Sequence, residues 1–305
     1  MAPGAFLMSV IIIVGNATTL VAIRRIPALQ TKSNAFVASL AGADLMVGLV
    51  LIPYGLWNVP NIRDRLNHIM YFCILMTSAG SSAVVISILS LLLVALDRLV
   101  FISRPFFYQR VVTNRVIAAG VALPWTLGLT FGNSQWLIYA PRTHPPQCVA
   151  TKVLPTYYYK YLASLLYFLP CLAVFCIYVR IAVIARTQRL AILKLTVVRA
   201  LGSPARAGGQ KLSDKSWRSV KMMMTVFGIF SSCWTPRFLL YALSDETFDE
   251  RVPELAYNLC MMLGLLNSGV NFLVYPAHNR EFRRGFRHLL GCKRSSVGPD
   301  IKSVH

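Results

Sequence analysis

The stretch from Ile69 to Leu96 reads IMYFCILMTSAGSSAVVISILSLLLVAL, contains no charged residue, and is followed at once by Asp97-Arg98-Leu99. A transmembrane helix needs about 20 mainly apolar residues, so this run is long enough to cross a bilayer. Asp97 and Arg98 therefore meet where the helix leaves the membrane, and a charge costs far less there than at the bilayer centre. Since either side chain can reach water or a partner from that place, the pair is a candidate switch.

Six further apolar runs share this character. The chain of 305 residues has a mean hydropathy of +0.57 and only 14% charged residues, whereas a soluble domain carries about 25%. The runs are long and do not alternate in polarity, which favours single helices over barrel strands. We therefore predict an all-α membrane protein, a seven-transmembrane helix bundle with a short amphipathic cytosolic helix.

The predicted spans are residues 5–24, 34–57, 70–101, 115–139, 155–186, 216–243 and 253–275. The amphipathic helix is predicted at 279–290, which makes 1–290 one domain and 291–305 a cytosolic tail. A basic segment at 186–214 contains Gly and Pro, so we expect a mobile linker there.

The net charge of +20 is distributed unevenly over this topology. With the N-terminus outside, 24 of the 31 Lys and Arg residues fall on the cytosolic side. This asymmetry follows the positive-inside rule and predicts that the C-terminus is cytosolic. Because topology explains the charge, nucleic-acid binding is not expected.

Three cysteines lie outside the predicted membrane core. Cys73 and Cys148 are both on the outer side, where a disulfide can form in an oxidising compartment; two free thiols are the alternative. Cys292 follows the amphipathic helix on the cytosolic side, where it is either a palmitoylation site or a plain thiol.

A carboxylate stands in the middle of the second predicted span. Asp44 must there be protonated, paired or bound to a cation. Asn267 and Asn271 are four residues apart and share one helical face in the last span. Together with Ser87 of the third span, these oxygens could surround a small hard cation, or they could form a hydrogen-bonded packing centre. The residues alone leave both interpretations open.

Large side chains form a stripe along one face of the sixth predicted span. Phe230, Trp234, Arg237 and Tyr241 follow at offsets of four, three and four residues, which places them on one face of a helix. Pro236 beside them frees a backbone carbonyl and permits a kink.

Arg237 is the unusual member of this stripe, because an arginine facing lipid would be costly. It is expected either to face a watery cavity and bind an anion, or to pair with an outer acid such as Glu254. On the cytosolic side, Phe106 and Phe107 follow the third span closely and suggest a protein contact, with anchoring in lipid headgroups as the alternative.

The order of motifs along the chain resembles the rhodopsin-like (class A) G-protein-coupled receptors over essentially its whole length. The motifs that carry the resemblance are Gly15-Asn16, Leu40 to Asp44, Cys73, Asp97-Arg98, Trp125, Pro170 with Tyr178, Cys233-Trp234-Thr235-Pro236, Asn271 to Tyr275, and Glu281-Phe282-Arg283. The subfamily stays unassigned, with a loose likeness to adenosine and lipid receptors. The resemblance implies a multi-pass plasma-membrane receptor, not an enzyme, that binds an extracellular ligand between its helices and activates a heterotrimeric G protein.

The resemblance also assigns roles to single residues. A sodium ion, the sole cofactor implied, would be held by Asp44, Ser87, Asn267, Ser268 and Asn271. The activation switch would comprise Asp97, Arg98, Tyr178, Phe230, Trp234, Pro236 and Tyr275. Arg98 and Phe106 would contact the G protein.

Three departures from the family pattern concern the inner half of the bundle, and the first is Asp97-Arg98-Leu99 in place of the usual Asp-Arg-Tyr. The usual Asn-Pro of the seventh helix is Asn271-Phe272 here, and a proline follows later at Pro276. Ser216 stands where many relatives keep an acid at the base of the sixth helix.

Two residues by which receptors of this family bind particular ligands are missing from this sequence, which narrows the choice of ligand. Gly80 occupies the place of the aspartate that pairs with amines in this family, and Leu265 that of the retinal-binding lysine. Amines and retinal are therefore not expected, and a lipid-like or anionic small molecule, or a peptide carboxylate, fits better. The predicted pocket residues are Tyr54, Asn58, Gly80, Ser81, Val84, Leu162, Leu166, Arg237, Phe238, Tyr241, Met261 and Leu265.

A transporter or channel is the alternative function. A transporter would favour inverted repeats and broken helices around charges at the midplane. The chain has no evident repeat and a single midplane acid, which argues against this alternative.

Overall fold

The computed structural model describes residues 2–57, 59, 61–62, 72–138, 154–199, 208–243 and 254–289. All regular structure in these residues is helical. The long helices are α1 (Ala2–Arg25), α2 (Lys32–Trp57), α4 (Phe72–Ser103), α6 (Asn114–Ile138), α8 (Ser164–Arg199), α9 (Gly208–Leu243) and α11 (Glu254–His278). The short ones are η1 (Pro27–Leu29), α5 (Pro105–Val111), the π-helix η2 (Tyr158–Ala163) and α12 (Arg280–Leu289).

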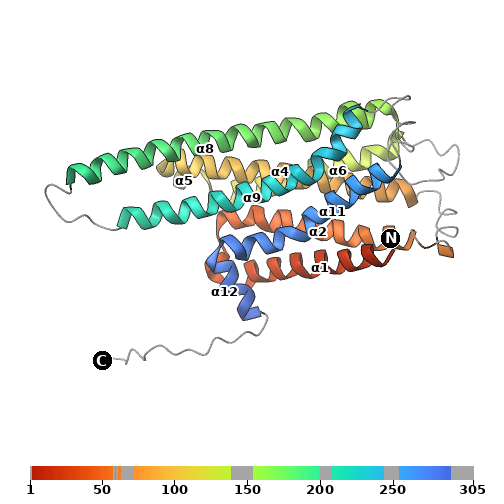
Figure 1. Ribbon diagram of the computed structural model, residues 1–305, viewed down its shortest axis with the longest axis horizontal. Helices are drawn as coiled ribbons and strands as arrows, with labels where there is room; N and C mark the ends of the chain where they lie inside the picture. The colour runs from red at the N-terminus through yellow and green to blue at the C-terminus, as the bar shows by residue number, and fades with distance from the viewer. Residues whose placement is uncertain are drawn as a thin grey trace.

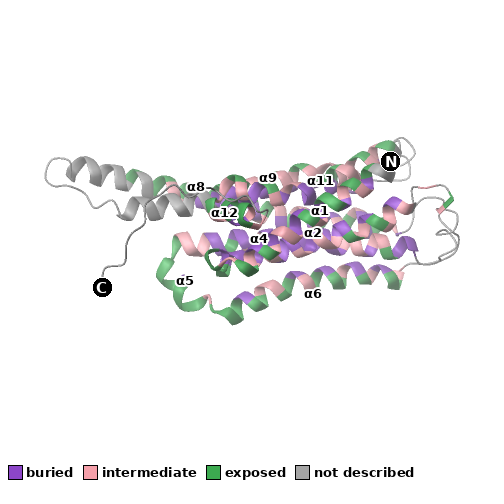
Figure 2. Cartoon of the chain, turned by 90° about the horizontal axis from the view of Figure 1, so that it is seen from below, coloured by how far each residue is buried: buried purple, intermediate pink, exposed green. Residues whose placement is uncertain are grey.

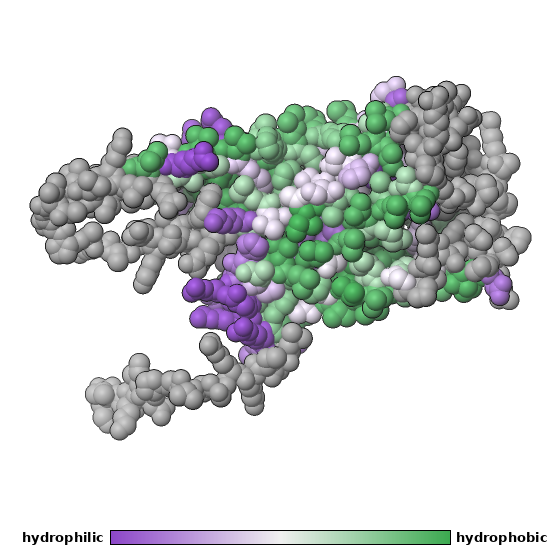
Figure 3. All heavy atoms as spheres, viewed as in Figure 1, coloured by the Kyte–Doolittle hydropathy of each residue, from purple (hydrophilic) through white to green (hydrophobic). Residues whose placement is uncertain are grey.

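The seven long helices lie side by side in one bundle (Figure 1), and each has a segment apolar and long enough to cross a membrane. The predicted all-α class and the seven spans are thus confirmed. In Figure 3 hydrophobic residues cover the middle of the described surface, and hydrophilic residues gather toward α12. We call the end of the bundle that holds the N-terminus the N-terminal end, and the opposite end, where α12 lies, the α12 end.

The predicted amphipathic helix is also confirmed. Phe282 of α12 is fully buried and packs 5.4 Å from the ring of Tyr275, whereas the arginines of α12 are exposed. A Cβ on Gly285 would lie 2.3 Å from Ile26, so α12 rests closely against the segment between α1 and α2.

The prediction of a mobile linker over 186–214 is largely wrong. Helix α8 continues to Arg199 and α9 already begins at Gly208, while residues 200–207 lie outside the described part. The segment before Gly202 contains Leu, Ile, Ala, Lys and Arg but no Gly or Pro, so its helix propensity is high enough to extend α8.

Helix α4 lies at the centre of the bundle and contacts α2, α6, α8 and α9. Figure 2 shows its buried residues continuing along most of its length. The closest approach is with α6, where Gly132 lies on the α4 backbone. A Cβ at this position would lie 1.9 Å from Ser82 Oγ and 2.5 Å from the carbonyl oxygen of Ser78. No side chain fits there unless the helices separate.

This contact predicts the effect of a single methyl group. Gly132→Ala should lower the apparent Tm of the purified protein in detergent by several degrees, because overpacking costs about 1–3 kcal/mol. Gly228→Ala on α9 is the matched control, since a Cβ there meets nothing within 4 Å and alanine favours the helix. Equal Tm values for the two variants would contradict the close packing of α6 on α4.

Candidate functional site

A cavity opens in the N-terminal half of the bundle, between α2, α4, α6, α8, α9 and α11. Its described lining is Val47, Val50, Leu51, Tyr54, Met76, Thr77, Gly80, Ser81, Val84, Val85, Ile88, Phe131, Ala163, Leu166, Tyr167, Trp234, Arg237, Phe238, Tyr241, Tyr257, Asn258, Met261 and Leu265. Arg237 is the sole charged residue in this described lining. The cavity therefore offers a cation and no carboxylate.

The cavity changes in polarity with depth. Along each helix, the lining residues nearest the N-terminal end are Tyr54 of α2, Met76 and Thr77 of α4, Tyr241 of α9, and Tyr257 and Asn258 of α11. Val47, Ile88 and Leu265 lie deepest on α2, α4 and α11 and are apolar, and Trp234 lies deepest on α9. Hydrogen-bonding groups thus predominate at the mouth of the cavity, and mainly apolar side chains form its floor.

Arg237 is held at the mouth by uncharged groups. Its Nη1 donates to the carbonyl oxygen of Tyr257 at 3.0 Å, and its Nη2 donates to the hydroxyl of Tyr241 at 2.7 Å. The guanidinium carbon also lies 5.0 Å from the centre of the Tyr241 ring, a cation–π contact. No described carboxylate pairs with Arg237, and the side chain of Glu254 lies outside the described part. Arg237 is therefore positioned, and its charge has no described counter-ion.

Most of the predicted pocket residues line this cavity. The structure places there Tyr54, Gly80, Ser81, Val84, Leu166, Arg237, Phe238, Tyr241, Met261 and Leu265. Asn58 lies outside the described residues.

Leu162 was predicted wrongly. It does not line the cavity and is 41% exposed. It belongs to the π-helix η2, and the next residue, Ala163, faces the cavity instead. A π-helix has a wider turn than the α-helix, so α-helical spacing cannot place this residue.

Sequence reasoning missed Asn258, although a signal for it exists. Asn258, Met261 and Leu265 stand at offsets of three and four on α11 and so share the face that lines the cavity. It also missed the contribution of α6, where Phe131 reaches the cavity and stacks on Tyr158 with ring centres 5.2 Å apart.

Two glycines shape the space around Trp234. A Cβ on Gly264 would lie 2.8 Å from the Trp234 ring, so the indole lies directly on the α11 backbone. A Cβ on Gly80, in contrast, would meet nothing within 4 Å. The cavity is therefore closed beside Trp234 and open beside Gly80.

A cluster of buried polar side chains adjoins the cavity floor, with Ser87 at the level of Ile88, and with Asp44 and Asn271 three residues beyond Val47 and six beyond Leu265. Asn271 Nδ2 donates to Asp44 Oδ2 at 2.8 Å, and Asn16 Nδ2 donates to the carbonyl oxygen of Ser268 at 3.1 Å. The five residues predicted to hold sodium are all buried, namely Asp44, Ser87, Asn267, Ser268 and Asn271. Asp44 and Asn271, from spans far apart in sequence, are in direct contact.

Oxygens in this cluster lack partners. Asp44 Oδ1, Asn267 Oδ1 and Asn271 Oδ1 are buried without a hydrogen bond, as is Asn16 Oδ1. A buried oxygen without a partner is costly, and a hard cation is a partner that oxygen atoms favour. The donor set thus fits a small hard cation better than a closed hydrogen-bonded centre.

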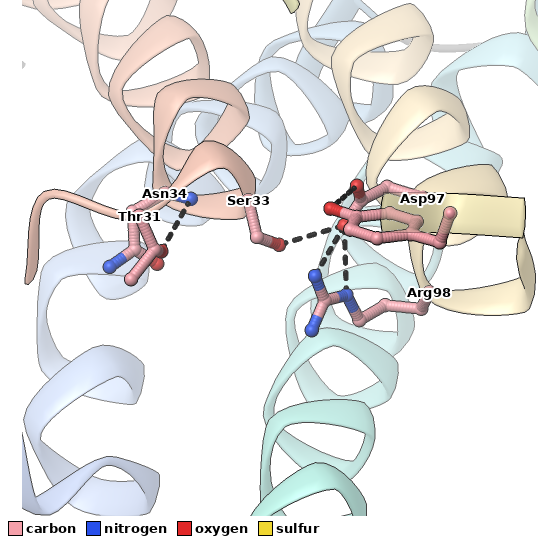
Figure 4. A network of polar contacts seen from close by, with 6 residues as sticks. Thr31, Ser33, Asn34, Asp97 and Arg98 are labelled. Carbon is pink, nitrogen blue, oxygen red and sulfur yellow. Dashed lines mark hydrogen bonds and ion pairs between the residues drawn. The ribbon is translucent and has the colours of Figure 1, made fainter. Parts of the chain in front are cut away.

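At the α12 end, Asp97 accepts three side-chain contacts (Figure 4). Arg98 Nε donates to Asp97 Oδ2 at 3.0 Å, and Arg98 Nη2 reaches the same oxygen. Ser33 of α2 donates to Asp97 Oδ2 at 2.9 Å, and Tyr108 of α5 donates to Oδ1 at 2.7 Å. The carboxylate therefore ties α2, α4 and α5 together and holds the guanidinium of Arg98 against its own helix.

Tyr108 anchors α5 to the bundle. Its ring packs edge-on against Phe101 at 5.2 Å, and burial, followed by the hydrogen bond to Asp97, raises the pKa of its hydroxyl well above the usual range. It therefore remains a donor at physiological pH. On the same short helix Phe106 is 87% exposed, which fits both a protein contact and anchoring in lipid headgroups, so its role stays a prediction.

The family described as 7 transmembrane receptor (rhodopsin family) matches residues 15–275. The chain belongs to this family. It is therefore a receptor of the G-protein-coupled class, not an enzyme, and the transporter alternative is excluded.

Relatives of the receptor include proteins named for amines. The histamine H2 receptor of Rattus norvegicus is 26% identical over 94% of this chain and 78% of its own length. The D(1)-like dopamine receptor of Oreochromis mossambicus is 29% identical over 96% of this chain and 78% of its own length. The D(1C) dopamine receptor of Xenopus laevis is 27% identical over 96% of this chain and 68% of its own length.

The remaining predicted switch residues of the receptor lie inside the bundle. Phe230, Trp234, Tyr178 and Tyr275 are buried, and Pro236 lies within α9. The hydroxyls of Tyr178 and Tyr275 are buried without a hydrogen bond, so both are available to new partners if the helices rearrange.

The receptor accommodates Phe272, which replaces the family's proline, through a glycine in α1. A Cβ on Gly15 would lie 2.2 Å from the Phe272 ring, so the ring lies flush against the α1 backbone. Pro276, the later proline, is inside α11 near its end at His278.

The outer disulfide and the lipid anchor depend on residues beyond the described part. Cys73 is buried and disulfide-bonded. Cys148 and Cys292 lie outside the described residues, so the Cys73–Cys148 pairing and the palmitoylation of Cys292 stay predictions.

The contacts of Asp97 predict the local stability of α5. A seven-residue helix is too short to be stable alone, and a hydrogen bond to a charged group contributes about 1.5–3 kcal/mol. Tyr108→Phe, which keeps the ring, should therefore speed amide hydrogen exchange in α5 roughly tenfold or more. Phe107→Leu is the control, because that ring is half exposed. Unchanged exchange in Tyr108→Phe would show that the hydroxyl does not anchor α5.

Proposed function

We propose that the receptor binds a small anionic, lipid-like molecule whose acid group pairs with Arg237. The observation that carries the proposal is the guanidinium at the mouth of a cavity with a mainly apolar interior, where no described residue supplies a carboxylate. A guanidinium can hold a carboxylate or phosphate in two parallel hydrogen bonds. Because Tyr241 and Tyr257 already fix its position, little side-chain entropy is lost on binding.

The expected arrangement places the receptor in the plasma membrane with the N-terminal end outside. The positive charges concentrated toward the α12 end support this orientation. A heterotrimeric G protein would then approach the α12 end, where Phe106 is exposed and Arg98 is restrained by Asp97.

An amine ligand is the second candidate, since the relatives are named for histamine and dopamine. An ammonium group in an apolar cavity needs a carboxylate beside it. The described lining contains none, and Gly80 stands where the family's amine receptors carry an aspartate. The chemistry of the cavity therefore favours an anion over an amine.

We further propose that Asp44, Ser87, Asn267, Ser268 and Asn271 hold a sodium ion. The support is the set of buried oxygens without partners. A cation there would join α2, α4 and α11 and so favour the arrangement in which these helices are close together.

The ligand proposal is tested by removing the positive charge of Arg237 from the cavity. Arg237→Ala should lower the potency of an anionic agonist by well over tenfold, because losing a desolvated charge pair costs about 2–5 kcal/mol. Arg237→Lys should restore part of this potency, since an ammonium group cannot form the two parallel hydrogen bonds that a guanidinium forms. The measurement is G-protein nucleotide exchange in membranes, with matched panels of lipid acids and biogenic amines and with surface expression recorded.

Gly80→Asp is the complementary variant, because the open space at Gly80 admits a carboxylate without a clash. This variant should lower the potency of acids and raise the potency of amines. Activation of the unaltered receptor by amines, with Arg237→Ala as potent as wild type, would reject the anionic ligand.

The sodium proposal needs no ligand to test. Raising NaCl at constant ionic strength with KCl should increase the apparent Tm of the purified receptor, since an ion that binds only the folded state stabilises it. Asp44→Asn should abolish the dependence on sodium. A sodium response that persists in this variant would place the ion elsewhere.

A further inference from the structure

The cavity is deep along α4. Met76 and Ile88 both line it and are twelve residues apart, so it follows about 18 Å of that helix at 1.5 Å per residue. Along this path Gly80 leaves open space, because a Cβ there would meet no atom within 4 Å. The cavity is therefore elongated rather than compact.

The floor of the cavity is mainly hydrocarbon, to which α9 adds the Trp234 ring. Val47 of α2, Val84 and Ile88 of α4, and Leu265 of α11 are all buried. The hydroxyl of the deepest tyrosine, Tyr167, is turned to Thr235 at 2.9 Å and to the carbonyl of Ser231 at 3.3 Å. Its hydrogen bonds are therefore already made, and the indole N–H of Trp234 is the other polar group at this depth of the described lining.

We infer that the receptor takes a straight-chain fatty acid, with its carboxylate at Arg237 and its alkyl tail running past Gly80 to the floor at Ile88. The distribution of polarity carries this assignment, since the one cation of the described lining lies at the mouth and mainly apolar side chains line the remaining depth, with Ser81 and the indole of Trp234 as the polar exceptions. This inference rests on the proposed contact of Arg237 with an acid, and it adds the chemistry and the direction of the tail.

The end of the tail would lie beside a residue of the buried core. Ile88 belongs to the same apolar cluster as Phe230 and Tyr178, and α4 contacts α9 directly. A tail long enough to touch Ile88 would alter this packing, because close-packed interiors transmit small displacements. Chain length is thus expected to decide both affinity and activation.

The experiment uses the saturated fatty acids from hexanoic to octadecanoic acid, presented on albumin. Binding is read from the apparent Tm of the purified receptor and activation from G-protein nucleotide exchange in membranes. Potency should rise roughly fourfold per methylene up to an optimum length, as expected from about 0.8 kcal/mol per buried methylene, and then fall.

Variants of the floor should move that optimum. Ile88→Ala extends the floor and should favour longer acids, whereas Val84→Leu and Ile88→Phe shorten it and should favour shorter ones. Ile86→Ala is the matched control, because Ile86 is equally buried on α4 but does not line the cavity. It should leave the optimum unchanged.

The two proposals fail in different ways. Arg237→Ala should weaken acids of every length without moving the optimum. If it does so while the floor variants leave the optimum in place, the tail assignment is overturned and the anionic contact stands. If the floor variants move the optimum but Arg237→Ala retains full potency, the contact with Arg237 is overturned. Failure of every acid in the series to bind or activate the wild-type receptor overturns the fatty-acid assignment.

Discussion

Hydrocarbon offers no hydrogen-bonding partner, and this constraint governs the interior of the receptor. The backbone is satisfied within the seven helices, so the polar side chains buried between them must satisfy one another or bind something else. Asp44 and Asn271 show the first solution, with a direct hydrogen bond across α2 and α11. The oxygens left over in the same cluster, and the guanidinium of Arg237 at the cavity mouth, show the second. Both candidate sites are places where the bundle is incomplete on its own.

The two ends of the bundle use their charges differently. At the N-terminal end Arg237 is fixed by an aromatic ring, a hydroxyl and a carbonyl, and no described carboxylate pairs with its charge. At the α12 end Arg98 is paired with Asp97, whose remaining oxygen positions are taken by Ser33 and Tyr108. The first arrangement suits recognition, because the charge is available to a ligand. The second suits restraint, because the charge is withheld until the carboxylate releases it.

Most of the fold could be predicted from the sequence, because lipid permits few alternatives to a long apolar helix. The pocket was largely accessible too, since Arg237, Trp234 and Tyr241 share a helical stripe whose period is regular. The orientation of Leu162 could not be predicted in this way, because a π-helical turn changes the spacing of side chains. No residue in Tyr158–Ala163 indicates from the sequence that this turn is a π-helix. The extension of α8 to Arg199 was missed for the opposite reason, since turn residues further along were given more weight than the helix formers before them. Contacts such as Gly15 with Phe272 join residues far apart in the chain, and a single sequence contains no signal for them.

That last contact changes how the seventh helix can move. Phe272 retains the backbone N–H that a proline would lack, and Asn16 donates to the carbonyl of Ser268 one turn earlier. With the Phe272 ring seated on Gly15, α11 is fastened to α1 by an amide and an aromatic ring at successive turns. Pro276 is the proline inside α11, and it lies close to where α12 begins at Arg280. A proline-dependent bend of α11 would therefore fall next to α12, so its effect would be to tilt α12 relative to the bundle rather than to bend α11 at mid-length.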